Sequence, residues 1–421
     1  MRKYIITFMV MMLASAIITG EAFTSEDSYS SPFSQADFVP DIALILDFSA
    51  VYRNLDNETF EGTELPAFIH AHGDEDDGHG HSHENFNASR GFNLNYGELS
   101  FFSAVDPYFN MFAALHLSPE SAALEEIYVT SQSLPAGLQV TLGKFRSAIG
   151  RLNSQHAHYW NFADAPLVYM AFFGQEGLNE IGVRATVLTP LPFYLELGGE
   201  VLSGDNASSF GSDGFEVNER KEDGNEYPDL YTGFMKTSID AGNLTVVLGG
   251  SLLRGQARIN HDVEEADGHA VYGKTWIFGG DLAAKYFIDS YRYIALQGEY
   301  LYRMIDGNKY TTNTAGDTTI RQDLEKNQSG LYAELIIKPS LRWRIGGRYG
   351  LLKTHHFSVA SDSVTIPADT LQRYSGMIEF NPSHFSRFRL QYNNDRSRYS
   401  HGERKINHEV ILQCNMAIGA H

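Results

Sequence analysis

From Asp41 to the C-terminus, short segments of alternating apolar and polar residues are joined by connections that are long and short in turn. About sixteen such segments occur, each roughly ten residues long. A transmembrane β-barrel has this asymmetry, because its periplasmic turns are tight and its extracellular loops are long. The pattern therefore predicts an all-β fold, a transmembrane antiparallel β-barrel of about 16 strands. The long connections include 54–91, 147–179, 203–228, 255–272, 306–327 and 355–370.

The alternation is clearest in the C-terminal half of the chain. In 341–351, Trp343 and Ile345 fall on one face of an extended strand, and arginines fall on the other. A soluble sheet also has one apolar face, but charges at the centres of many strands favour a water-filled interior. Barrels of about 16–18 strands leave an aqueous channel, so the fold predicts passage of solutes. The strands are expected at 41–53, 92–104, 108–117, 124–132, 138–146, 180–188, 193–202, 229–240, 243–254, 273–288, 291–305, 328–338, 341–353, 371–381, 385–397 and 405–418, with a β-bulge near Glu98.

Residues 1–22 have the layout of a signal peptide, with a basic start, an apolar run and a small-residue cleavage site. The apolar run is shorter than the roughly 20 residues that a membrane-spanning helix needs, which disfavours a membrane anchor. Residues 23–40 then form a short periplasmic segment before the barrel, 41–421. These features predict export to the outer membrane of a Gram-negative bacterium, where the barrel contacts membrane lipid.

The composition narrows the function classes. A formal net charge of −20 argues against nucleic acid as a partner and favours attraction of cations. Cys414 is the only cysteine and precludes an internal disulfide. Serine and histidine occur, but no spacing nominates a catalytic triad, so we expect no enzymatic activity and no required cofactor.

The first long connection is rich in histidine and acidic residues. Five imidazoles and five carboxylates lie within the fifteen residues 70–84. Imidazole and carboxylate ligands suit Zn²⁺, and imidazole also suits Cu²⁺ or Ni²⁺, so the segment is a candidate metal collector. The alternative is a solvated acidic loop without a metal. The candidate ligands are His70, His72, Asp74, Asp76, His79, His81, His83 and Glu84, whereas His116, His384 and His408 are assigned no role.

The connection 147–179 is too apolar and aromatic for a mobile surface loop. A long loop of this kind in a porin-sized barrel can fold inward and narrow the pore. Opposed charges at such a constriction select ions by charge. Alternatively, the wall arginines pair with acidic side chains across neighbouring strands and stiffen the wall. The candidate constriction acids are Asp164, Glu176 and Glu180, and the candidate pore-lining residues are Arg342, Arg344, Arg348, Arg387, Arg389, Glu196 and Glu200.

The same region carries a family resemblance. The motifs that carry it are Ile149-Gly150-Arg151-Leu152-Asn153, Pro166-Leu167-Val168-Tyr169, Glu176-Gly177-Leu178-Asn179-Glu180 and Asn95-Tyr96-Gly97-Glu98-Leu99. In these motifs and in the His-rich connection, the chain resembles a family of Gram-negative outer-membrane porin-like proteins. That family is related to the phosphate-selective porins and is often labelled a zinc-regulated, TonB-dependent outer-membrane receptor. The resemblance implies a channel or receptor for small solutes, and its label suggests metal uptake.

These observations predict a porin for passive uptake of small solutes, linked to zinc acquisition through the His-rich connection. The partners would be membrane lipid, small solutes or metal ions, and two further copies in a homotrimer. TonB-dependent receptors have about 22 strands and a folded plug, and residues 23–40 are too few for a plug, which favours a diffusion porin. The alternative is a non-conducting surface metal-binding receptor or adhesin, which a conductance measurement would distinguish.

Overall fold

A computed structural model describes residues 40–68, 86–119, 121–217, 220–359 and 370–419. Contacts divide the chain into the units Met1–Val39 and Pro40–His421, and only the second is described. The predicted signal peptide, the segment 23–39 and all eight candidate metal ligands of the His-rich connection lie outside the described residues. In the described part of the chain, no helix is both long and apolar enough to cross a membrane.

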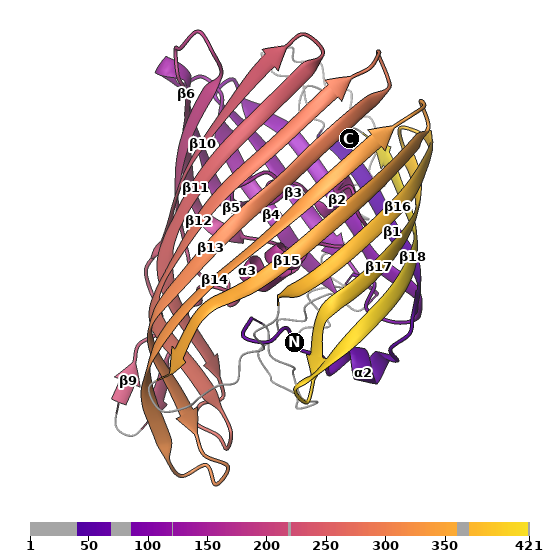
Figure 1. Ribbon diagram of the computed structural model, residues 1–421. Coiled ribbons are helices and arrows are strands. Elements are labelled where there is room, and N and C mark those ends of the chain that lie inside the picture. Colours follow the sequence, from indigo (N-terminus) through magenta and orange to yellow (C-terminus); the bar gives the residue numbers. More distant parts are fainter. Residues whose placement is uncertain (1–39, 69–85, 120, 218–219, 360–369, 420–421) are drawn as a thin grey trace, which may run out of the picture. The chain divides into compact units, whose positions relative to one another are not determined.

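Sixteen antiparallel strands form one closed barrel, in which each strand pairs with its neighbours along the chain and β1 pairs with β18 (Figure 1). The predicted fold class is confirmed. The wall consists of β1 Asp41–Arg53, β2 Gly91–Asp106, β3 Phe109–Leu117, β4 Ala122–Ser131, β5 Leu138–Arg146, β6 Asn179–Leu188, β7 Leu195–Leu202, β10 Leu230–Ala241, β11 Leu244–His261, β12 His269–Phe287, β13 Tyr293–Thr312, β14 Thr319–Lys338, β15 Trp343–Val359, β16 Leu371–Ser383, β17 Ser386–Ser400 and β18 Glu403–Gly419. The connections contain α2 Asn57–Glu61, η2 Pro135–Gly137, η3 Ala157–Tyr159, α3 Leu167–Phe173 and the hairpin of β8 Phe215–Val217 and β9 Arg220–Glu222.

The two faces of the wall differ in chemistry, and the alternation explains why. In β18, the side chains of Val410, Leu412 and Met416 are exposed, whereas those of Ile411 and Gln413 between them are buried. Successive side chains of a strand point to opposite faces, so every second residue lies on the outer surface. Exposed leucine, isoleucine, valine and aromatic side chains recur on every wall strand, as the hydrocarbon of a membrane requires.

The connections differ from the sequence-based expectation. The expected loops 255–272 and 306–327 are mostly strand, and only 262–268 and 313–318 remain as connections. These strand ends lack the regular outward apolar residues on which the period-two prediction depended. The alternation of long and short connections is also incomplete, because the connections 118–121 and 401–402 are tight.

Candidate functional site inside the barrel

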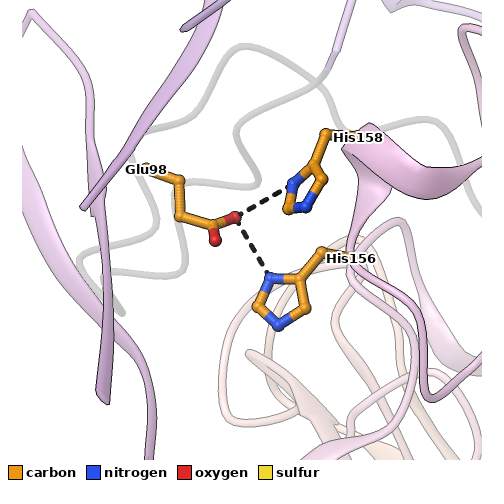
Figure 2. Close-up of side chains that lie close together, drawn as sticks. All are labelled: Glu98, His156 and His158. Atoms are coloured by element: carbon orange, nitrogen blue, oxygen red, sulfur yellow. Dashed lines mark hydrogen bonds and ion pairs between the residues drawn. The ribbon is translucent and has the colours of Figure 1, made fainter. Parts of the chain in front are cut away.

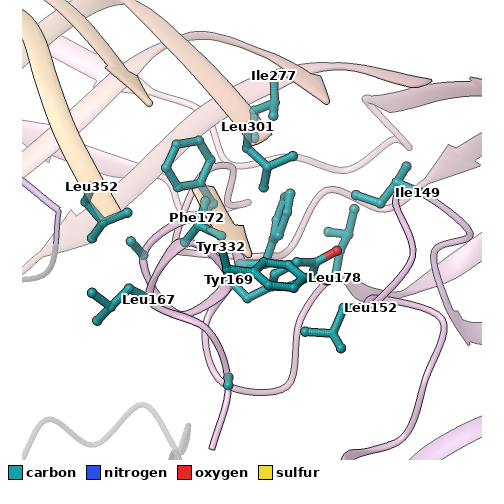
Figure 3. Packing of buried hydrophobic residues seen from close by; sticks show 14 of the residues in the cluster. Ile149, Leu152, Leu167, Tyr169, Phe172, Leu178, Ile277, Leu301, Tyr332 and Leu352 are labelled. Atoms are coloured by element: carbon teal, nitrogen blue, oxygen red, sulfur yellow. The ribbon is translucent and has the colours of Figure 1, made fainter. Parts of the chain in front are cut away.

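The connection 147–178 folds against the inward face of the wall, and we call it the inner loop. Its short helix α3 is buried on nearly every side, which suits a helix that is apolar all round. Figure 3 shows Tyr169 and Phe172 of this helix packed with Leu301 and Tyr332 of the wall. The same apolar cluster includes wall residues of β7 and β10–β17, so the inner loop contacts much of the barrel circumference: Leu202, Leu230, Leu253, Ile277, Leu301, Tyr332, Leu352, Leu371 and Tyr399.

Asp164 forms a charged contact between the middle of the inner loop and the wall. Its carboxylate pairs with Arg348 of β15 and, at 2.9 Å, with Arg373 of β16. Gln391 accepts a hydrogen bond from the backbone N–H of Ala163 at 2.7 Å. Although burial opposes ionisation, the charges of Arg348 and Arg373 lower the pKa of Asp164 below its usual value. The carboxylate therefore stays charged, and these pairs are lost only when the pH falls below the ordinary aspartate range.

Glu299 of β13 forms a second contact, near the start of the inner loop. Its carboxylate accepts hydrogen bonds from the backbone N–H of Leu152 at 2.8 Å and the hydroxyl of Tyr169 at 2.8 Å. The hydroxyl of Tyr332 donates a third at 2.7 Å. Glu299 of the wall thus positions the inner loop, and both of its carboxylate oxygens accept hydrogen bonds.

We expect Gly150→Ala to loosen the inner loop. Gly150 has φ +56°, and an added Cβ would lie 2.1 Å from Glu299 Oε2. A non-glycine residue in the left-handed region costs about 1–2 kcal/mol before this clash is counted. Limited proteolysis should therefore cut within residues 151–177 faster than in the wild type. Gly402→Ala is the matched control, because Gly402 has φ +77° but no atom within 4 Å of an added Cβ. Equal cleavage of the inner loop in the G150A and G402A proteins would contradict this role of Gly150.

The sequence left open whether the predicted arginines face the inner loop or pair with acidic side chains across neighbouring strands, and both arrangements occur. Glu379 of β16 pairs across strands with Arg344 at 2.9 Å and Arg389 at 2.8 Å. The same arginines also contact the inner loop, Arg344 through the side chain of Asn161 and Arg389 through the carbonyl of Trp160 at 2.8 Å. Arg387 donates to the carbonyl of His158 at 2.7 Å, whereas Arg342 lies exposed in the turn before β15.

The other two candidate constriction acids do not face these arginines as expected, and the candidate pore-lining acids Glu196 and Glu200 bond to groups near them on the wall and the inner loop. Glu180 accepts hydrogen bonds from the backbone N–H groups of residues 204–206 and from Ser203. Glu176 is exposed, and only its backbone carbonyl is in contact with Arg146. Glu200 is buried and accepts hydrogen bonds from Ala148 N at 2.9 Å and Thr232 at 2.7 Å, while Glu196 pairs with the Tyr194 hydroxyl at 2.5 Å. Asp164 is thus the candidate constriction acid that meets the arginines.

A second polar centre lies where two β-bulges interrupt the wall. The pairing of β1 with β2 skips Asn95, close to the predicted bulge, so that Asn95 and Tyr96 are both buried. The pairing of β3 with β4 skips Glu125, so that Glu125 and Glu126 are both buried. A bulge lets adjacent residues share one face, and it thereby brings an additional carboxylate inward.

These bulges and the inner loop form a cluster of imidazoles and carboxylates, which we call the carboxylate–imidazole cluster: Glu98, His116, Glu125, Glu126, His156 and His158. In Figure 2, the Nδ1 atoms of His156 and His158 face one carboxylate oxygen of Glu98, at 3.1 and 3.3 Å. His116 Nε2 lies 2.7 Å from Glu125. A histidine to which the sequence assigned no role is therefore part of the cluster.

The carboxylates of the cluster stabilise positive charge on the His156 imidazole beside them. Burial opposes protonation of the His156 imidazole, but its contacts with Glu125, Glu126 and Glu98 outweigh burial and raise the pKa of His156 well above its usual value. Imidazoles and carboxylates in such an arrangement can hold either protons or a metal ion. Period-two analysis of β2–β4 could have placed Glu98 inward, and the change of phase near Glu98 signalled the bulge at Asn95, whereas no such signal pointed to the skipped Glu125.

The closed antiparallel barrel of sixteen strands is the fold of outer-membrane porins. The chain is similar to the outer membrane channel DcaP of Acinetobacter baumannii, with a TM-score of 0.56 and 11% identity over 91% of this chain and 99% of that chain. It is also similar to a loop L8 deletion mutant of OmpT, an outer membrane protein of Vibrio cholerae, with a TM-score of 0.52 and 8% identity over 91% of this chain and 100% of that chain. These identities show the shared fold alone.

The family is shown by sequence. The chain belongs to the same family as an uncharacterized protein of Aquifex aeolicus (strain VF5), with 49% identity over 393 residues, 93% of this chain and 81% of that protein. No family model matches the chain.

Proposed function

We propose that this protein is an outer-membrane channel for small solutes in which the inner loop forms the constriction. The observation that carries the proposal is the contact of Asp164 with Arg348 and Arg373, which ties the middle of the inner loop to the wall. The exposed apolar surface of the barrel suits membrane lipid, and the shared fold with porins supports a location in the outer membrane. A wall of this strand number is wide enough for an aqueous path beside a folded loop.

The space beside Asp164 is lined by both charged and apolar side chains. A cavity of about 50 Å³ lies between the inner loop and the wall, and its lining includes Asp164, Arg373, Asp395, Arg398 and Glu409. Charges of both signs line it, so an ion that enters this cavity would experience a transverse field. Planar-bilayer recording of the refolded protein tests the channel directly, and the absence of any ion-conducting state would refute it.

A link to zinc acquisition is the finer part of the proposal, and it rests on the His-rich connection. Deletion of residues 70–84 should lower the number of Zn²⁺ ions bound and reduce the effect of Zn²⁺ on conductance, since the candidate ligands are removed. Equilibrium dialysis and bilayer recording with and without Zn²⁺ check this. A matched variant with the five histidines of 70–84 changed to glutamine retains the length and the acids. Unchanged Zn²⁺ binding in both variants would contradict the zinc link.

The second candidate is a non-conducting surface receptor or adhesin. The observation that favours it is the extensive packing of the inner loop against wall strands from β7 to β17. A wild-type barrel that inserts in bilayers and stays insulating would select this alternative. Assembly as a homotrimer stays a prediction, tested by the mass of the detergent-solubilised protein.

A further inference from the structure

We propose that Glu98, His156 and His158 bind one divalent transition-metal ion inside the barrel, in a site built from residues that are not part of the His-rich connection. One atom of each residue lies within 4.8 Å of the others. A second group, Glu98, His116 and Glu125, shares Glu98 with the first. Four further potential ligands, two from each group, thus lie around the Glu98 carboxylate, and Glu125 or His116 can complete the coordination.

The distances suit the coordination of zinc. Tetrahedral Zn²⁺ has ligand bonds of about 2.0–2.1 Å, which places neighbouring ligand atoms about 3.3–3.4 Å apart. The separations of Glu98 Oε2 from His156 Nδ1 and His158 Nδ1 are 3.1 and 3.3 Å. His156 Nδ1 also lies 3.5 Å from Glu125 Oε2. Small side-chain movements would therefore be enough to accommodate an ion between these atoms.

The ring nitrogen of His156 that faces away from Glu98 has the kind of hydrogen-bond partner that metal-binding histidines usually have. His156 points Nδ1 at Glu98, while its Nε2 lies 2.7 Å from Glu126. Glu126 is in turn held by a hydrogen bond of 2.7 Å from the backbone N–H of Arg146. A carboxylate on the second ring nitrogen fixes the tautomer and the ring orientation of a histidine that binds metal. Glu126 is therefore a positioning residue for His156.

The charge of the cluster also suits a divalent cation. Glu98, Glu125 and Glu126 have side chains that are at most 5% exposed. Among the described residues, Arg146 is the one arginine or lysine in an ion pair with any of these carboxylates, and its partner is Glu125. Three negative charges and one positive charge leave a charge of −2 when the imidazoles are neutral. A divalent ion would balance it, whereas two protons on the histidines would do the same without metal.

Zn²⁺ binding by the full-length protein tests the proposal, with variants that separate this site from residues 70–84. Isothermal titration should detect a site that is lost in the double variant His156→Gln/His158→Gln and retained after deletion of 70–84. Glu98→Gln, which preserves volume, should also abolish it. Glu126→Gln should weaken binding about 10–100-fold, as the loss of an outer hydrogen bond does. Co²⁺ in place of Zn²⁺ gives an independent absorption signal from the site.

His384→Gln is the matched control, because His384 is exposed in the turn between β16 and β17. It should bind Zn²⁺ as the wild type does. Heat-modified electrophoretic mobility confirms a folded barrel for each variant. The proposal is overturned if the protein lacking 70–84 binds no Zn²⁺, or if folded E98Q and H156Q/H158Q proteins bind as the control does. Either result would leave the cluster as protonated histidines paired with carboxylates.

Discussion

Replacement of the inner loop by a short turn is expected to raise the single-channel conductance severalfold. The inner loop occupies interior space that a sixteen-stranded wall would otherwise leave to water. Its ends are adjacent, because Arg146 and Asn179 are register partners and Ser147 N donates to the Leu178 carbonyl at 2.9 Å. Residues 148–177 can therefore be replaced by a Gly-Ser turn without straining β5 or β6. Planar-bilayer recording measures the change.

The connection 313–318 provides the matched control for this replacement. Its ends are also register partners, Thr312 and Thr319, and the same Gly-Ser turn leaves the inner loop intact. We expect this control to conduct as the wild type does. Equal conductance of the wild type, the control and the variant without the inner loop would mean that the inner loop is not the constriction.

Asp164→Ala is expected to release the middle of the inner loop while the barrel stays closed. Arg348 and Arg373 are buried and would each lose a partner, although Arg373 keeps its pair with Asp395 at 2.9 Å. Removal of one partner of a buried ion pair costs about 3–5 kcal/mol. The docked inner loop should then open often enough to give flickering currents, a higher mean conductance and rapid proteolysis within 151–177.

Asp317→Ala is the control, since Asp317 is an exposed acid of the connection 313–318. Asp164→Asn should be intermediate, because the amide retains a hydrogen-bond acceptor but not the charge. If D164A and D317A proteins show the same currents and the same protease sensitivity, the ion pairs of Asp164 do not hold the inner loop.

The wall could be predicted because lipid imposes a simple rule. An outward apolar residue is needed at every second position, and residues such as Trp343, Ile345 and Leu390 display it in the sequence. The rule does not apply beyond the membrane, which is why the outer ends of β11–β14 were expected to be loops. The inward folding of 147–179 was suggested by its apolar composition, but its partners were only partly foreseen.

The site residues that sequence analysis missed depend on contacts between segments that are far apart in the sequence. Arg348 was a candidate, whereas Arg373 was missed although it shares the inward face of β16 with Glu379. The carboxylate–imidazole cluster depends on the skipped residues Asn95 and Glu125, and a skipped residue reverses the face of those that follow. Such shifts are set by the pairing of neighbouring strands.

The most direct test of the channel is single-channel recording of the wild-type protein, with the variant that lacks residues 148–177 measured under the same conditions. We predict discrete conductance steps for the wild type and larger steps for the variant. A wild-type barrel that inserts but stays insulating, while the variant conducts, would contradict the channel and identify the inner loop as a plug.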